Sequence, residues 1–235
     1  MSRLNVSNLL CTIFGILFRL LTRVTVAGKE NLPVDKGYIV ASNHLGIIEV
    51  PLVYCLLARA DVTGLVAKKH QSQPLFRWIV DSLGGIWLNR DEADTRAIRQ
   101  ATDHLKRGGV LGISPEGTRS PTGSMIAAKT GVAYLADRAG VPIVPTSVTG
   151  TWKAIRDVLL LHRPRITVRF GEPFILPPVE RRERDADLQR NTDEIMAQIA
   201  ALLPPEYRGV YAEHPRIKEL LEAKGGDKWI ESKLD

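Results

Sequence analysis

Residues 42–51 read Ser-Asn-His-Leu-Gly-Ile-Ile-Glu-Val-Pro, and this stretch follows an apolar run. It places His44 and Glu49 five positions apart. Five residues turn a helix through about 500°, and in a strand they point to opposite faces, so the two side chains meet only if the chain bends. Gly46 permits a bend, and Pro51 suits the first turn of a helix. The stretch therefore predicts a strand, a tight turn at His44 and a helix that begins near Glu49.

The pair has a chemical meaning if the side chains meet. A histidine can take a proton from an attacking hydroxyl, an effect worth about 10²–10⁴ in rate. A carboxylate would fix its tautomer and stabilise the imidazolium, and the helix dipole favours a charged Glu49. Spacing alone does not separate this pair from a polar turn with a hydrogen-bonded histidine. We predict no metal site, because no third ligand stands near His44 and Glu49 at a suitable spacing.

The composition is that of a globular domain with a basic surface. The chain has 235 residues, of which 44% are hydrophobic and 25% charged, and its net charge is +6. This balance favours anionic partners such as membrane lipid or a phosphorylated substrate. We predict no nucleic-acid binding, because the basic runs lack the interleaved aromatic side chains that stack on bases. Cys11 and Cys55 lie in apolar runs, with no CxxC motif and no disulfide framework, so nothing in this pattern requires an oxidising compartment.

The N-terminal segment, residues 4–22, is strongly apolar. Its uninterrupted part, Leu9–Phe18, has ten residues, whereas a bilayer span needs roughly 20. A signal peptide is disfavoured because no cleavage site follows. We expect a helix in the membrane interface, with Arg3, Arg19 and Arg23 near anionic headgroups. The alternative is a helix that packs on the core of its own domain.

Strands and helices alternate along most of the chain, which predicts an α/β fold with a mixed, largely parallel central sheet flanked by helices. Pro142 and Pro145 confine the strand that carries them to an edge or an irregular position. We expect one domain in three parts: a membrane-associating helix (1–22), an α/β core (23–178) and a helical extension packed on that core (179–235). The predicted strands are 23–28, 38–42, 62–67, 86–88, 110–114, 141–148 and 166–170; the predicted helices are 50–59, 74–83, 93–107, 127–139, 188–203 and 215–224.

A second group of polar residues follows the strand at 110–114, where an α/β sheet usually binds its ligands. Within this loop, Arg119 offers a bidentate fork suited to phosphate, and Gly117 allows close backbone approach. Arg90 and Lys68 also follow short strands, so the three cations could gather at one sheet edge. The alternative is a surface loop with solvated charges.

Ser114 lies in a sequence that resembles a nucleophile elbow, Gly112-Ile-Ser-Pro-Glu116. The last glycine of that motif is replaced by Glu116. Pro115 also lacks the N–H that an oxyanion hole would use directly after the nucleophile. These two departures disfavour Ser114 as a nucleophile.

Four blocks together resemble the glycerolipid acyltransferase family, typified by 1-acyl-sn-glycerol-3-phosphate acyltransferase. They are Asn43-His44 with Glu49, Gly85–Arg90, Pro115–Ser120 (Pro-Glu-Gly-Thr-Arg-Ser) and Val141–Pro145, and Ala67-Lys68 and Lys129-Thr-Gly131 also resemble family positions between them. The order and spacing of the blocks agree over roughly residues 24–175. The family carboxylate is usually aspartate, and Glu49 adds a methylene.

The resemblance implies transfer of a fatty acyl group from acyl-CoA or acyl carrier protein to the hydroxyl of a lysophospholipid, in particular 1-acylglycerol-3-phosphate, to give phosphatidic acid. His44 would be the general base and Glu49 would orient it, without an acyl-enzyme. The residues implied in holding the acceptor phosphate and shaping its site are Lys68, Arg90, Glu116, Gly117, Thr118 and Arg119.

The resemblance implies no separate cofactor, and no metal. It places the enzyme at the cytoplasmic face of the cell membrane, as a peripheral or monotopic protein on anionic lipid. Because Glu49 departs from the family pattern, two rival functions are kept. One is a phospholipid-binding member with altered catalysis, and the other is a lipid esterase that uses Ser114.

Overall fold

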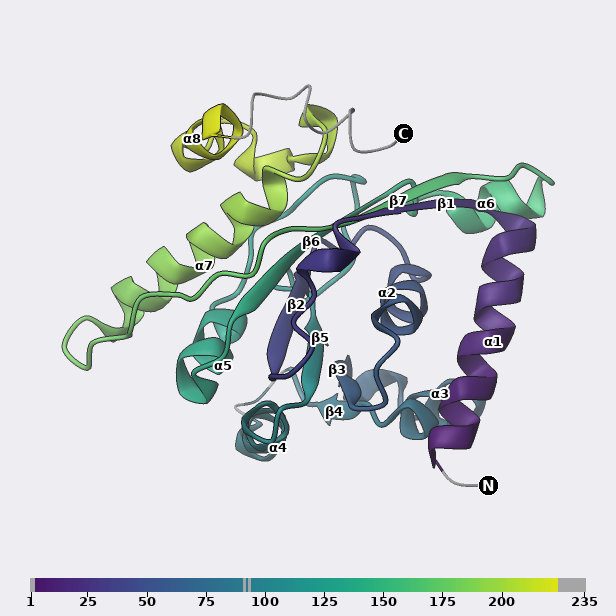
Figure 1. Cartoon of the computed structure of the whole chain (residues 1–235), viewed down its shortest axis with the longest axis horizontal. Coiled ribbons are helices and arrows are strands. Elements are labelled where there is room, and N and C mark those ends of the chain that lie inside the picture. The colour runs from purple at the N-terminus through teal and green to yellow at the C-terminus, as the bar shows by residue number, and fades with distance from the viewer. Residues whose placement is uncertain (1–2, 91, 93, 224–235) are drawn as a thin grey trace.

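The computed structural model describes residues 3–90, 92 and 94–223 and has a seven-stranded sheet at its centre (Figure 1). The strand order is β1-β7-β6-β2-β5-β3-β4. Its strands are β1 (Arg23–Ala27), β2 (Tyr38–Ser42), β3 (Val62–Ala67), β4 (Ile86–Leu88), β5 (Val110–Ile113), β6 (Ile143–Thr149) and β7 (Arg165–Phe170). All neighbours run parallel except β6 and β7, so the predicted mixed, largely parallel sheet is confirmed.

Helices cover both faces of this sheet, as Figure 1 shows. One face carries α1 (Arg3–Leu21), α2 (Glu49–Leu57) and α3 (Pro74–Leu83). The other carries α4 (Thr95–Lys106), α5 (Gly131–Ala139) and α7 (Arg184–Ala200), with α8 (Pro215–Ala223) packed on α7. The short helix α6 (Ala154–Leu159) follows β6 and was not predicted from the sequence.

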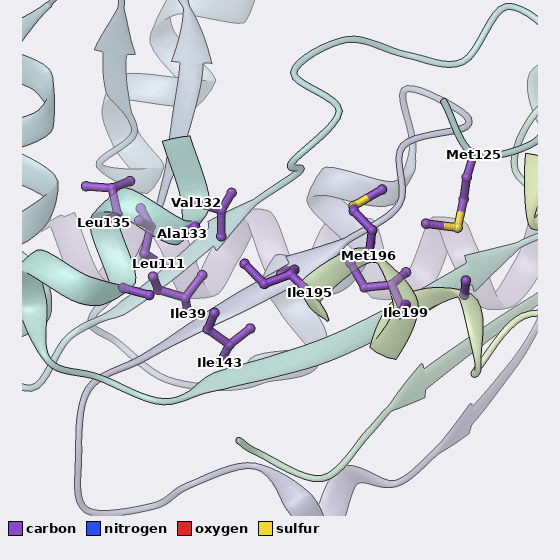
Figure 2. Close-up of a cluster of buried hydrophobic side chains, with 14 of the residues drawn as sticks. Ile39, Leu111, Met125, Val132, Ala133, Leu135, Ile143, Ile195, Met196 and Ile199 are labelled. Carbon is purple, nitrogen blue, oxygen red and sulfur yellow. The ribbon is translucent and has the colours of Figure 1, made fainter. Parts of the chain in front are cut away.

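The central strand β2 shows how the sheet separates two apolar cores. Ile39 and Ala41 belong to the core under α4, α5 and α7, which Figure 2 shows in part. Tyr38 and Val40 belong to the core on the other face. Successive side chains of a strand point to opposite faces, so the continuous apolar run at 38–42 is what a strand buried on both faces requires.

Local signals set several element boundaries. The α4 helix begins after Asp94, whose carboxylate accepts a hydrogen bond from the Ala97 N–H, as an N-cap does. The sequence also offers Asp91 as a cap for this helix, and Asp91 lies outside the described residues. The α3 helix starts at Pro74 and ends before Gly84, which is left-handed. These residue types encode the helix ends directly, and the predicted bounds of α3 agree with the structure.

The proline-bearing strand was predicted at an edge or an irregular position; it is not at an edge, but Pro145 does lie in an irregular break of the pairing between the Ile143–Phe174 bridge and the ladder that begins at Thr146. The strand β6 lies between β7 and β2, and all of its residues are buried. Its ladder to β7 begins only at Thr146, so Pro145 lies just beyond that ladder, at a place where a missing N–H costs little. The Pro145 carbonyl still accepts a hydrogen bond from the Gly171 N–H, 2.8 Å away.

Two helix boundaries also differ from prediction. The α5 helix begins at Gly131, four residues later than expected. The α7 helix begins at Arg184, four residues earlier than expected, within a run dense in charged residues (179–187), and its Asp187 is buried. The Asp187 carboxylate accepts a hydrogen bond from the Glu180 N–H, so a charged residue here closes the turn before the helix.

The N-terminal helix α1 has apolar residues on two sides. Leu10 is buried and Phe18 packs against the core, as the core-packing alternative requires. The outward side is also apolar, with Leu9, Ile13, Ile16, Leu17, Leu20 and Leu21 exposed. Among the described residues, no helix is long and apolar enough to cross a membrane. The side chain of Arg3 lies outside the described residues.

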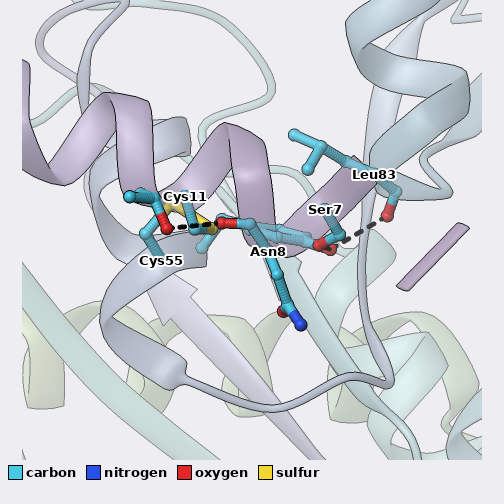
Figure 3. Close-up of a disulfide and its surroundings, with 7 residues drawn as sticks. Ser7, Asn8, Cys11, Cys55 and Leu83 are labelled. Atoms are coloured by element: carbon cyan, nitrogen blue, oxygen red, sulfur yellow. Dashed lines mark hydrogen bonds between the residues drawn. A yellow bond between two sulfur atoms is a disulfide. The ribbon is translucent and has the colours of Figure 1, made fainter. Parts of the chain in front are cut away.

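The structure corrects the interpretation of the cysteines. Cys11 of α1 and Cys55 of α2 form a disulfide, with 5.3 Å between their Cα atoms (Figure 3). Nearby, Ser7 and Leu83 are both hydrogen-bonded to the hydroxyl of Tyr54. Packing of α1 on α2 brings together two cysteines 44 positions apart, a contact that their spacing does not reveal.

Candidate active site

His44 and Glu49 meet as the spacing predicted. His44 follows β2, and Glu49 is the first residue of α2. The His44 Nδ1 atom lies 2.9 Å from Glu49 Oε2, and the two side chains are 19% and 2% exposed. Among the described residues, nothing hydrogen-bonds to the other ring nitrogen, Nε2. The imidazole is therefore held at one nitrogen and open at the other.

The Glu49 carboxylate is surrounded by hydrogen-bond donors. It accepts from the Leu45 N–H at 2.9 Å and from the Gly46 N–H at 2.8 Å. The Thr151 hydroxyl also donates to Oε1. These donors fix the position of the carboxylate next to the Nδ1 atom of His44.

Gly46 is required here for close approach. A Cβ atom at this position would lie 2.5 Å from the Thr151 carbonyl oxygen. Its φ is not among the positive values, so the turn does not need glycine for a left-handed backbone. The predicted bend is present. Glycine is needed at this position because a side chain would keep the Thr151 backbone from coming close enough for its hydroxyl to reach Glu49.

The loop after β5 holds the backbone of His44 on both sides. The His44 N–H donates to Glu116 Oε1 at 3.0 Å, and the His44 carbonyl accepts from the Ser120 N–H at 2.7 Å. The second Glu116 oxygen accepts from the Ile126 N–H at 3.3 Å. Thus the Pro-Glu-Gly-Thr-Arg-Ser block and the histidine turn form one hydrogen-bonded unit.

Glu116 is a buried carboxyl, 2% exposed. Burial raises its pKa to about 7; the N–H groups of His44 and Ile126 oppose this, and the charge of Glu49 adds to it. Because both Glu116 oxygens bond to backbone groups, the side chain supports the loop from inside.

The three predicted cations follow β3, β4 and β5, and all three are exposed. Burial lowers the pKa of His70, and the positive charges of Lys69, Arg119 and Arg90 lower it further. The side chains of Arg90 and Arg119 therefore both lie near His70, although Arg90 follows β4 and Arg119 follows β5. Lys68, directly after β3, is two residues before His70. Arg90 and Arg119 thus share the surroundings of His70, and the topology puts the end of β3 next to them.

Gly117 and Thr118 lie in the same loop. The Arg90 guanidinium donates to the Gly117 carbonyl oxygen, which ties the end of β4 to this loop. Gly117 has φ near +68°, a left-handed conformation that favours glycine. The Thr118 side chain is exposed. The loop therefore presents Thr118 and Arg119 to solvent next to the Arg90 contact.

The geometry of Ser114 differs from that of a nucleophile. Its hydroxyl donates to the Ser42 carbonyl oxygen at 2.7 Å. Among the described hydrogen bonds, none joins Ser114 to His44. The hydroxyl thus links the ends of β5 and β2. No group of three His, Cys, Asp or Glu side chains in the described part of the chain is placed to hold a metal ion.

Two residues of this site were missed as contributors from the sequence. Thr151 lies just after β6, at the edge where the carboxyl ends of the parallel strands meet, and that placement was the available signal. Asn43 was noted only as part of a block. Its amide accepts from the Val148 N–H and donates to the Val148 carbonyl, both at 2.8 Å, which extends the pairing of β2 with β6.

The chain is similar to known acyltransferases. The acyltransferase family model matches residues 23–149. The chain is 28% identical over 200 residues to a 1-acyl-sn-glycerol-3-phosphate acyltransferase of Chlamydomonas reinhardtii, covering 81% of this chain and 56% of that protein. It is 30% identical to the enzyme of that name from Bacillus subtilis, covering 64% and 73%. The chain thus spans about half the length of the first of these relatives.

A solved structure is also similar. The crystal structure of the 1-acyl-sn-glycerophosphate acyltransferase PlsC from Thermotoga maritima superposes with a TM-score of 0.62 at 27% sequence identity. The match covers 82% of this chain and 79% of that one.

Replacing Thr151 by valine keeps its shape but removes the hydroxyl that donates to Glu49. Because Glu49 is buried, we expect the free energy of unfolding to fall by about 1–3 kcal/mol. Urea titration measures this, and Thr151→Ser, which keeps the hydroxyl, should retain most of the stability. Equal stability of Thr151→Val and the wild type would contradict the contact.

Glu116 should make stability depend on pH. Its pKa rises from 4.5 to about 7 on folding, so between these pH values the folded protein binds more protons than the unfolded chain. The free energy of unfolding of the wild type should therefore fall, by about 3 kcal/mol, as pH rises through this window. Glu116→Gln removes this dependence, whereas Glu213→Gln, at an exposed position, should keep it. If the free energy of unfolding of the wild type and of Glu116→Gln changed with pH in the same way, the raised pKa of Glu116 would be disproved.

Proposed function

We propose, because the chain belongs to the acyltransferase family, that it transfers a fatty acyl group from acyl-CoA or acyl carrier protein to the hydroxyl of a lysophospholipid. The proposed acceptor is 1-acylglycerol-3-phosphate, which would give phosphatidic acid. Curated relatives carry the name 1-acyl-sn-glycerol-3-phosphate acyltransferase. The observation that carries the proposal is the His44–Glu49 pair, hydrogen-bonded at one ring nitrogen and open at the other.

His44 would act as the general base. Its Nε2 atom takes the proton of the acceptor hydroxyl while the oxygen attacks the thioester carbonyl carbon. The tetrahedral intermediate collapses as the C–S bond breaks, and the imidazolium returns the proton to the departing sulfur. Glu49 keeps the proton on Nδ1 and stabilises the imidazolium, as the carboxylate of a serine-hydrolase triad does. The acyl group passes directly to the acceptor, without an acyl-enzyme.

Lys68, Arg90 and Arg119 would bind the acceptor phosphate. They extend from the ends of three neighbouring strands, and a phosphate among them would be neutralised by charge and by the arginine forks. Gly117 and Thr118 would shape the edge of this site. Glu116 would contribute by holding the loop, because its carboxyl is buried and bonded to backbone N–H groups.

The protein would work as a peripheral enzyme at the cytoplasmic face of the cell membrane. The outward side of α1 is apolar, and Arg19 and Arg23 near its end are exposed. An apolar helix face flanked by cations binds the surface of a bilayer that contains anionic lipid. This arrangement supports α1 as a membrane-interface helix that also packs on α2 and α3.

The assay that tests the proposal mixes purified protein with acyl-CoA and 1-acylglycerol-3-phosphate. We expect release of free CoA and formation of phosphatidic acid, identified by its mass. His44→Ala should abolish both, because the base is lost. Ser114→Ala should keep most of the rate, since its hydroxyl bonds to Ser42. His214→Ala, outside the site, is the matched control and should be active.

Two outcomes would favour the rival functions. Hydrolysis of a lipid ester that Ser114→Ala abolishes would identify an esterase. Binding of the lysophospholipid without turnover, unchanged by His44→Ala, would identify a phospholipid-binding member with altered catalysis, as the exchange of aspartate for Glu49 allows.

A further inference from the structure

The helix α6 and the turn before it present apolar side chains to solvent. Ile155 and Leu159 of α6 are 51% and 78% exposed, and Trp152 in the preceding turn is 43% exposed. Ala154 on the inner side is buried. A surface helix normally turns its apolar face inward and its polar face to water. The reverse arrangement here marks a surface that meets an apolar partner.

The end of α6 is a leucine tip, which we define as Leu159, Leu160 and Leu161. Leu161 is 93% exposed and has φ near +58°, a left-handed backbone that is unfavourable for leucine. Glycine is the usual residue at this position after a helix. Three consecutive exposed apolar residues, one of them in a strained position, are a fault in a soluble surface unless they have a function. We therefore expect the side chain of Leu161 to contact a partner rather than to stabilise the fold.

The leucine tip is joined to the end of α1. Arg163, two residues after Leu161, donates to the carbonyl oxygens of Arg19 at 2.7 Å and of Thr22 at 3.1 Å. Leu20, next to Arg19, is 64% exposed. Figure 1 shows α6 beside this end of α1. The tip thus extends the outward apolar side of α1.

The other end of α6 lies at the candidate active site. Thr151, whose hydroxyl donates to Glu49, is three residues before Ala154, the first residue of α6. The Ala154 N–H also bonds to the Thr151 carbonyl. The apolar surface therefore runs from the end of α1 to the residues that hold His44.

Cations flank the tip in the chain. The exposed basic side chains just before α6, on it and just after it are Lys153, Arg156, Arg163 and Arg165, and Asp157 is the acidic residue in this stretch. Exposed leucines flanked by cations match the surface of a bilayer, where leucine enters the acyl region and cations meet anionic headgroups.

We propose that the leucine tip inserts into the membrane as a second contact, beside the end of the N-terminal helix, and that the partner is a bilayer with anionic lipid. Two contacts fix the orientation of a protein on a surface, whereas one helix leaves it free to rotate. Because α6 begins just after Thr151 and ends at the tip, the bound enzyme presents the end of β6 and the His44 turn to the lipid. The lysophospholipid then enters the site from the bilayer without crossing water.

Leu161→Gly tests the proposal without damage to the fold. Glycine relieves the left-handed strain, so the unfolding midpoint should stay the same or rise. Affinity for vesicles with anionic phospholipid, measured by co-sedimentation, should fall about tenfold, since one exposed leucine leaves the bilayer. Val210→Gly, which removes an apolar side chain that is 67% exposed beside α8, is the matched control and should bind like the wild type.

A double variant, Leu159→Ser with Leu160→Ser, checks the same surface, and Ile16→Ser on α1 serves as comparison. The expected result is weaker vesicle binding by the tip variants and by Ile16→Ser, each with unchanged turnover of substrate dispersed in detergent. If both tip variants bind vesicles like the wild type and only Ile16→Ser binds more weakly, the proposed membrane contact of the leucine tip is wrong. The proposed docking of α1 would then stand. Absence of vesicle binding by the wild type would overturn both, whereas detergent turnover tests the proposed acyl transfer by itself.

Discussion

The buried carboxylate of Glu49 is the interaction on which the rest of the site depends. It collects donors from three directions: the turn at Leu45 and Gly46, the ring of His44, and the hydroxyl of Thr151. A buried charge is tolerated only when it is paired and hydrogen-bonded. The need to satisfy this one group therefore sets the bend after β2, the start of α2 and the approach of the segment after β6.

A parallel sheet makes this assembly possible. The carboxyl ends of β2, β5 and β6 are neighbours, so residues far apart in the chain meet at one edge. The loop after β5 clamps the backbone of His44 through Glu116 and Ser120, while β3 and β4 bring cations to the same edge. In the proposed reaction, this divides the work between a base that is held rigidly and a phosphate site that is open to solvent.

Much of the fold could be predicted because its signals are local. The run at 38–42 is apolar throughout, as a doubly covered strand must be, and Pro74 and Gly84 mark the ends of α3. What the sequence left open or missed concerns contacts between distant residues. An interior place for β6 depends on where its ladder to β7 begins, and the Cys11–Cys55 disulfide depends on the packing of α1 on α2.

The sequence predicted those parts of the candidate site whose residues are close together in a motif. It missed the parts that only the tertiary structure brings together. His44 and Glu49 could be paired from the sequence, whereas Thr151, 102 positions from Glu49, could not. Its hydroxyl also gives a physical reason why a glutamate can stand at a position where the family usually has aspartate: the longer side chain is anchored at its far oxygen. The exchange is therefore compatible with a rigidly held imidazole.

The rate of acyl transfer by Glu49→Gln tests this account most directly. Glutamine keeps the size of the side chain but loses the charge that fixes the Nδ1 proton and stabilises the imidazolium. If Glu49 orients and supports His44, kcat should fall by at least about a hundredfold while the protein remains folded. A folded variant with the wild-type kcat would contradict the account, because His44 would then work without the carboxylate that holds it.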